Sequence, residues 1–240
     1  MNKSILIIIS YTYVFSVFLL LFTFKNELTL FILLQNSLLF LYISYLILRC
    51  YINSDSKLFS LASKVTFLRL NISIVILTAA INSSMNPIIF EIFYLERIIV
   101  ILAVLSFMLD GLDGFIARKY NHVTKFGEII DQESDNFLML VLSISLYLNR
   151  EVGMYIFLIP LYRYIFILYM SRYSWLKIEL PSSQFRKFAC AFTILLMIIA
   201  QDSYLGHKNT IILVFLSLFI ITFSFAKDII WLYRNKYEKT

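Results

Sequence analysis

Four aspartates lie close together in the segment LDGLDGFIARKYNHVTKFGEIIDQESDNF, residues 109–137 of an otherwise strongly apolar chain. Asp110 and Asp113 are three residues apart, and Asp131 and Asp135 are four apart. On a helix, each of these spacings places both side chains on one face. Two such faces, opposed across a helical hairpin, bring four carboxylates together, and their mutual repulsion requires a cation. The spacing therefore predicts a metal site.

Carboxylate oxygens are hard ligands that suit Mg²⁺, Mn²⁺ or Ca²⁺, and carboxylates shared between two such ions recur where displacement occurs at phosphorus. Magnesium takes few protein ligands and is completed by substrate phosphates. Arg118 adds a planar fork that matches phosphate oxygens. Small residues allow a backbone or a bulky ligand to approach closely; those near the aspartates are Gly111, Gly114, Ala117 and Gly127. A pyrophosphate-like ligand fits this combination.

The elements that must position these residues are membrane helices. Of the 240 residues, 60% are hydrophobic, whereas soluble domains contain roughly 45–50%. Apolar runs near the length of a spanning helix recur along the chain. We place them at 4–24, 27–49, 66–82, 88–109, 128–149, 152–170, 187–201 and 209–232. The first run is longer than the apolar part of a signal peptide and lacks a small-residue cleavage site. We therefore expect an all-α, polytopic integral membrane bundle.

The basic residues predict the orientation of the bundle. With a cytoplasmic N-terminus and eight spans, the cytoplasmic side collects Lys3, Arg49, Lys57, Lys64, Arg118, Lys119, Lys125, Arg172, Lys177, Arg186, Lys187, Lys227, Arg234, Lys236 and Lys239. The opposite side receives Lys25, Arg150 and Lys208. This asymmetry follows the positive-inside rule and places the aspartates at the cytoplasmic side. The net charge of +6 is scattered between apolar runs, which argues against a nucleic-acid partner.

The chain divides into three parts on this reading of its apolar runs. Residues 1–50 form a transmembrane hairpin without a motif, 51–65 a cytoplasmic juxtamembrane segment, and 66–240 a six-helix core. Cys50 and Cys190 are far apart and lack metal-binding spacing, so we interpret both as packing residues.

The aspartate segment fits the pattern D-x2-D-G-x2-A-R-x8-G-x3-D-x3-D at every fixed position. The matching residues are Asp110, Asp113, Gly114, Ala117, Arg118, Gly127, Asp131 and Asp135. In this pattern the chain resembles the CDP-alcohol phosphatidyltransferase family (class I). The resemblance covers roughly residues 62–232 and leaves residues 1–50 outside.

The resemblance implies a reaction and a role for each matching residue. An acceptor hydroxyl attacks the phosphorus of a CDP-linked lipid, expected to be CDP-diacylglycerol, and CMP leaves. Asp110, Asp113 and Asp131 hold two Mg²⁺ or Mn²⁺ ions, and Asp135 acts as general base while sharing a metal. The positions matching Gly114, Ala117, Arg118 and Gly127 bind the CDP and phosphate groups. The family likeness also implies a homodimer with its active site open to the cytoplasm, in the inner membrane if the source is bacterial.

Outside this pattern the likeness is looser. The stretch VTFLR at 65–69 resembles the start of the first core helix, with Ala62-Ser63 where Pro-Asn is usual. The stretch PSSQFRK at 181–187 resembles a later loop, with Phe185-Arg186 where glycine is expected. Four basic residues are candidates for contacts with the acceptor or a lipid phosphate: Arg69, Arg163, Arg186 and Lys187.

Alternative functions remain open at this point. A transferase that uses CDP-choline or CDP-ethanolamine with diacylglycerol as acceptor has the same pattern. A carboxylate-lined cation transporter would also keep aspartates in a helical bundle, but its charged residues would be spread over several spans. A catalytically silent scaffold would be expected to lack one or more of the aspartates. Structural ion pairs with Arg118, Lys119 and Lys125 do not explain the regular spacing.

Overall fold

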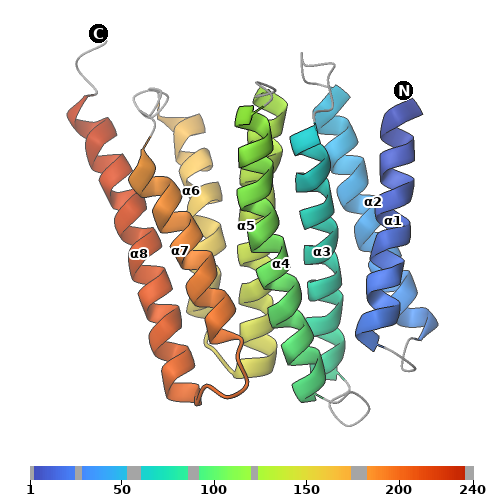
Figure 1. The fold of residues 1–240 in the computed structure, drawn as a ribbon. Helices are drawn as coiled ribbons and strands as arrows, with labels where there is room; N and C mark the ends of the chain where they lie inside the picture. Colours follow the sequence, from blue (N-terminus) through green and yellow to red (C-terminus); the bar gives the residue numbers. More distant parts are fainter. Residues whose placement is uncertain are drawn as a thin grey trace.

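The computed structural model describes residues 3–24, 29–52, 61–85, 92–119, 124–173 and 183–235. These residues form eight α-helices, one short 3₁₀ helix and no strand (Figure 1). The bounds are α1 Lys3–Phe24, α2 Leu30–Ile52, α3 Leu61–Met85, α4 Ile92–Lys119, α5 Lys125–Arg150, η2 Met154–Phe157, α6 Leu158–Arg172, α7 Gln184–Ala200 and α8 His207–Arg234. The predicted all-α bundle is confirmed, and each of the eight apolar segments corresponds to one α-helix.

The helices run side by side, and successive helices point in opposite directions (Figure 1). Helix α1 begins and α8 ends at the same end of the bundle, where α4 also ends and α5 begins (Figure 1). We call this end of the bundle the aspartate end. Because helices satisfy their backbone hydrogen bonds internally, such a bundle suits a lipid environment.

Five helical segments of the described residues are long and apolar enough to cross a membrane, judged by length and composition alone: α1, α2, α3, α6 together with η2, and α8. Helices α4 and α5 have 28 and 26 residues, which correspond to roughly 40 Å, and both carry charged residues. Helix α7 has 17 residues. All three lie in the same bundle as the five apolar helices (Figure 1), and the chain is an integral membrane protein.

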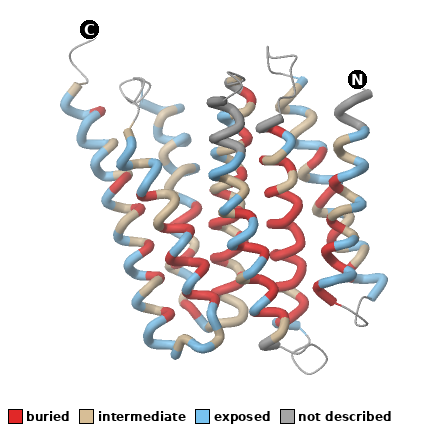
Figure 2. The backbone as a smooth tube through the Cα atoms, in the orientation of Figure 1, coloured by how far each residue is buried: buried red, intermediate tan, exposed pale blue. Residues whose placement is uncertain are grey.

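Helix α3 is the most extensively buried element (Figure 2). It packs against α1, α2, α4 and α5. Three of its buried polar side chains donate within the helix itself: Asn71, Ser73 and Thr78 each donate to the carbonyl four residues earlier, at 2.8–3.0 Å. Such back-bonding lets polar residues lie inside an apolar bundle at low cost.

Helix α5 has defined caps at both ends. The Thr124 hydroxyl accepts a hydrogen bond from the Gly127 amide at 3.0 Å, which is a typical N-cap contact. At the other end Glu151 adopts a left-handed conformation with φ 55°, which terminates the helix. These caps fix where α5 begins, and hence the position of Asp131 and Asp135 in its second and third turns.

The end of the bundle opposite the aspartates is held by a polar network. Arg150 on α5 lies 3.7 Å from the Glu96 carboxylate on α4 and donates to the Gln201 carbonyl at 3.0 Å. Gln201, directly after α7, accepts from Ser145 and donates to the Leu142 carbonyl, both at 3.0 Å. This network fixes α4, α5 and α7 relative to one another.

The hairpin of α1 and α2 packs beside α3 (Figure 1). Asn36 on α2 donates to Ser16 on α1, and Asn82 on α3 donates to Gln35 on α2, both at 3.0 Å. Hydrogen bonds between helices of this kind stabilise membrane bundles. The division of the chain into 1–50, 51–65 and 66–240 stays a prediction; residues 53–60 of its middle segment lie outside the described residues.

Candidate functional site

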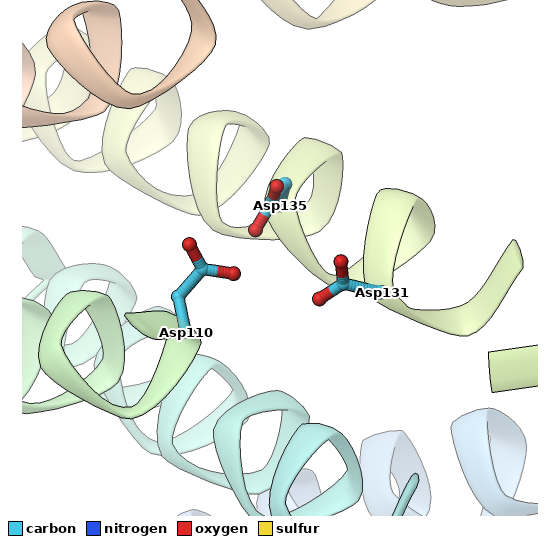
Figure 3. Close-up of side chains that lie close together, drawn as sticks. All are labelled: Asp110, Asp131 and Asp135. Carbon is cyan, nitrogen blue, oxygen red and sulfur yellow. The ribbon is translucent and has the colours of Figure 1, made fainter. Parts of the chain in front are cut away.

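Three of the predicted carboxylates meet between α4 and α5. Asp110 extends from α4 toward Asp131 and Asp135 on α5 (Figure 3). One carboxylate oxygen from each of the three lies within 4.8 Å of the others. The four-residue spacing on α5 thus places two carboxylates on one face, opposite Asp110 on α4. We call Asp110, Asp131 and Asp135 the aspartate cluster.

Helix α4 continues through Lys119, so Asp113 is also on this helix. Its side chain lies outside the described ones, as do those of Gly114, Ala117 and Arg118. The functions assigned to these residues therefore stay predictions.

Arg69 on α3 binds all three members of the aspartate cluster. Its Nη1 atom lies 2.8 Å from Asp110 Oδ1 and 2.9 Å from Asp131 Oδ1, and its Nη2 atom lies 2.5 Å from Asp135 Oδ1. The Arg69 side chain is 1% exposed, whereas the three carboxylates are 31%, 42% and 22% exposed. The buried Arg69 guanidinium thus contacts the aspartate cluster from the interior of the bundle, and the three carboxylates are partly accessible to solvent.

The aspartate cluster is suited to hold a divalent metal ion. Six oxygens around Mg²⁺ at 2.0–2.1 Å lie about 3–4 Å from one another, close to the spread of the three carboxylate oxygens. The donor set consists of hard oxygens, and the Arg69 guanidinium supplies positive charge among them. The spacing and the chemistry of the three carboxylate oxygens therefore fit a divalent metal ion.

Gly127 lies where α5 passes close to α3. A Cβ atom at this position would be 3.1 Å from the capping Thr124 hydroxyl and 3.6 Å from the Ser63 hydroxyl on α3. Gly111 on α4 has no such neighbour within 4 Å. Of the two described glycines near the cluster, Gly111 and Gly127, it is therefore Gly127 whose small size the packing uses.

The remaining acceptor-side candidates lie on α6 and α7. Arg163 donates to Gln132 at 2.9 Å and to Glu133 at 2.7 Å, both on α5. Arg186 is paired with Asp228 on α8 at 3.2 Å. Lys187 follows it with an exposed side chain. Of the four basic candidates, Arg69 is the one whose contacts with the aspartate cluster the structure describes.

Sequence reasoning did not anticipate the contacts of Arg69 or the group around Arg163. Glu133 accepts from Arg163 and also from the Tyr164 hydroxyl at 3.0 Å. The available signal was an arginine inside an apolar run, since a charge at membrane depth requires a partner. That signal predicts that a partner exists without naming it. The weighed ion pairs of the aspartates with Arg118, Lys119 and Lys125 involve side chains outside the described ones.

Comparison with known proteins identifies the family. A sequence model of the CDP-alcohol phosphatidyltransferase family matches residues 59–228. The chain therefore belongs to the CDP-alcohol phosphatidyltransferase family. It is an integral membrane enzyme that transfers a phosphatidyl group to an alcohol in phospholipid synthesis. This result favours the enzyme over the transporter and silent-scaffold alternatives.

Curated relatives come from Rickettsia. A protein of Rickettsia typhi (strain ATCC VR-144 / Wilmington) is 30% identical over 130 residues, which are 52% of this chain and 71% of that protein. A protein of Rickettsia bellii (strain RML369-C) is 38% identical over 82 residues, or 34% of this chain and 40% of that protein. Both are named "CDP-diacylglycerol--glycerol-3-phosphate 3-phosphatidyltransferase". No solved structure gives a significant match to the chain.

Proposed function

We propose that this enzyme transfers the phosphatidyl group of CDP-diacylglycerol to the primary hydroxyl of glycerol 3-phosphate and releases CMP. The observation that carries the proposal is the meeting of three carboxylates at the aspartate cluster, in a family whose substrates are CDP-alcohols. The names of the Rickettsia relatives favour this donor and this acceptor. The choice of glycerol 3-phosphate as acceptor rests on these names.

Asp110, Asp113 and Asp131 hold two Mg²⁺ or Mn²⁺ ions in this proposal, with Asp135 as a shared ligand. Metal ions held by these carboxylates would supply positive charge to the pyrophosphate oxygens of the donor and to the departing CMP. Gly114, Ala117, Arg118 and Gly127 contact the CDP and phosphate groups. Of these, Gly127 lies at the close approach of α3 and α5.

Asp135 takes the proton of the acceptor hydroxyl. The hydroxyl oxygen forms a bond to the phosphorus that bears the lipid, the bond from that phosphorus to the CMP oxygen breaks, and the hydroxyl proton passes to an Asp135 oxygen. A positioned carboxylate contributes about 10²–10⁴-fold to such a step. Asp135 is 22% exposed, so its carboxylate is accessible to an acceptor.

Basic side chains on α6 and α7 support an anionic acceptor. Arg163, Arg186 and Lys187 are proposed to contact the acceptor phosphate or a lipid phosphate. Arg163 extends from α6 toward α5 and binds Gln132 and Glu133. In the sequence, these two residues lie between Asp131 and Asp135. Arginine matches phosphate oxygens through its planar fork, so these residues favour an acceptor that carries phosphate.

We also propose that the aspartate end faces the cytoplasm and that the enzyme is a homodimer. The basic residues of the chain concentrate at the aspartate end. The positive-inside rule assigns the end that is rich in basic residues to the cytoplasm. Size measurement in lipid nanodiscs tests the homodimer: a mass of two chains supports it, and a mass of one chain rules it out.

The experiment for the proposed function supplies purified enzyme in lipid with Mg²⁺ and CDP-diacylglycerol, and varies the alcohol. Glycerol 3-phosphate, serine, an inositol compound and glycerol form the panel, and mass spectrometry identifies the lipid product. Phosphatidylglycerol phosphate formed from glycerol 3-phosphate alone supports the proposal. If product forms with a different alcohol instead, that alcohol is the acceptor and the proposed acceptor is wrong. If product forms from CDP-choline or CDP-ethanolamine with diacylglycerol, and none forms from CDP-diacylglycerol, the proposed donor is wrong.

A further inference from the structure

Arg69 is a buried cation that connects three helices at the site. It extends from α3, and its Nη1 atom bridges Asp110 on α4 and Asp131 on α5 at 2.8 and 2.9 Å. Its Nη2 atom binds Asp135 one turn further along α5. A guanidinium that bridges carboxylates from two helices holds those helices together.

We propose that Arg69 is a tethered counter-cation of the metal site, which neutralises the aspartate cluster in the absence of metal and lowers the affinity of the cluster for metal ions. This inference rests on the proposed function in taking the cluster as the metal site. It gives Arg69 a positioning role in place of the acceptor contact that its sequence position suggests.

The charges of the described side chains support this role. The three described carboxylates and the guanidinium carry −3 + 1 = −2, so the cluster still attracts divalent cations. Without Arg69 the same carboxylates carry −3 and bind a cation more strongly, but they repel one another more when no metal is bound. Arg69 thus lowers the metal affinity of the cluster and stabilises the metal-free protein.

The surroundings of Arg69 keep its charge at the cluster. The side chain is 1% exposed, and α3 is the most buried helix of the bundle. Its backbone carbonyl accepts a hydrogen bond from Ser73 at 3.0 Å. Because a buried charge without a partner is costly, Arg69 stays with the carboxylates and acts on the site whether or not a substrate is present.

The test compares Arg69→Gln with the unmodified enzyme using metal alone, without donor or acceptor. Mn²⁺ affinity is measured by electron paramagnetic resonance, and Tm is measured in EDTA and in saturating Mg²⁺. We expect Arg69→Gln to bind Mn²⁺ at least about tenfold more tightly, since a unit charge a few ångströms from the ion has been removed. Its Tm falls in EDTA and recovers in Mg²⁺.

Arg150→Gln is the matched control. Arg150 is also an ion-paired arginine of low exposure, at the opposite end of the bundle. Its loss lowers Tm in EDTA and in Mg²⁺ equally and leaves Mn²⁺ affinity unchanged. An Arg69→Gln variant that behaves in this way, or binds Mn²⁺ more weakly than the unmodified enzyme, overturns the proposal.

Arg69→Lys keeps the positive charge but not the planar fork. We expect near-normal Mn²⁺ affinity and a larger rise of Tm on adding Mg²⁺ than in the unmodified enzyme, because metal must then supply the bridge between α4 and α5. If Arg69→Gln does not fold, the Arg69→Lys variant tests the proposal. A rise of Tm on adding Mg²⁺ that equals the rise in the unmodified enzyme overturns the proposal. Since no substrate is used, the outcome is independent of whether the enzyme uses CDP-diacylglycerol.

Discussion

The ring of Tyr51, near the end of α2, packs edge-on against the ring of Phe126 in the first turn of α5, with centroids 5.2 Å apart. Phe126 is buried and forms a small apolar cluster with Leu70 and Ile130. Ile130 directly precedes Asp131, one of the proposed metal ligands. The family match begins at residue 59, so a helix outside it supports the start of the helix that bears two site aspartates.

Replacing Tyr51 by alanine is expected to loosen the start of α5. An aromatic pair of this kind contributes about 0.5–1.5 kcal/mol beyond the area that it buries, so we expect Tm to fall by a few degrees and Mn²⁺ affinity to fall with it. Tyr45→Ala is the control, because Tyr45 lies on the same helix and is 59% exposed. Equal behaviour of the two variants would show that α2 does not support the site.

The two described glycines near the aspartate cluster are expected to respond differently to alanine. At Gly111 there is open space, and replacing a helical glycine by alanine gains about 0.5–1 kcal/mol, so Tm rises. At Gly127 the new methyl group crowds the capping Thr124 hydroxyl at 3.1 Å, so the gain is lost, and Gly127→Leu lowers Tm and Mn²⁺ affinity. Thermal unfolding of the three variants tests this; a higher Tm for Gly127→Leu would contradict it.

Removing Arg163 is expected to weaken binding of an anionic acceptor. A hydrogen bond to a charged group contributes about 1.5–3 kcal/mol, so Arg163→Gln should raise KM for glycerol 3-phosphate about 10- to 100-fold, with KM for CDP-diacylglycerol unchanged. Arg172→Gln, an exposed position on the same helix, is the control. If steady-state kinetics show the same acceptor KM for both variants, Arg163 does not contact the acceptor.

The orientation of the bundle can be tested with single cysteines in a variant whose Cys50 and Cys190, both free thiols, are replaced by serine. Lys208 and Arg234 are exposed near the two ends of α8. We expect Lys208→Cys to react with a membrane-impermeant maleimide in intact cells and Arg234→Cys to react only after lysis. The reverse pattern would place the aspartate end outside the cytoplasm.

The sequence was sufficient to locate the helices and to predict that Asp110, Asp131 and Asp135 lie close together. Apolar runs of spanning length are a strong signal, because lipid excludes unpaired backbone groups, and the four-residue spacing of Asp131 and Asp135 places both on one face. Helix α4 extends ten residues beyond the predicted end at 109, to Lys119. Its last turns contain charged residues, so hydrophobicity alone gives no reason to include them.

Contacts between helices distant in sequence were beyond this reasoning. Arg69 is a candidate for contacts with the acceptor or a lipid phosphate from its sequence, and this stays a prediction. Spacing along one helix does not reveal which neighbour a side chain meets, so the contacts of Arg69 with the aspartate cluster come from the structure alone. Arg97 does not appear in the predicted distribution of basic residues between the two sides of the membrane. It donates to the Tyr204 hydroxyl, away from the aspartate end. Long-range partners depend on how the helices pack, which no local pattern specifies.

The most direct test of the central claim is the release of CMP from CDP-diacylglycerol by purified enzyme in lipid, with Asp135→Asn as the test variant and Asp202→Asn as the control. Asp202 is exposed at the end of the bundle opposite the aspartate cluster. We predict release that requires both a divalent metal and glycerol 3-phosphate, falls about 10²–10⁴-fold in Asp135→Asn, and is unchanged in Asp202→Asn. Full release by Asp135→Asn, with its fold intact, would contradict the assignment of Asp135 as the base and of the aspartate cluster as the active site.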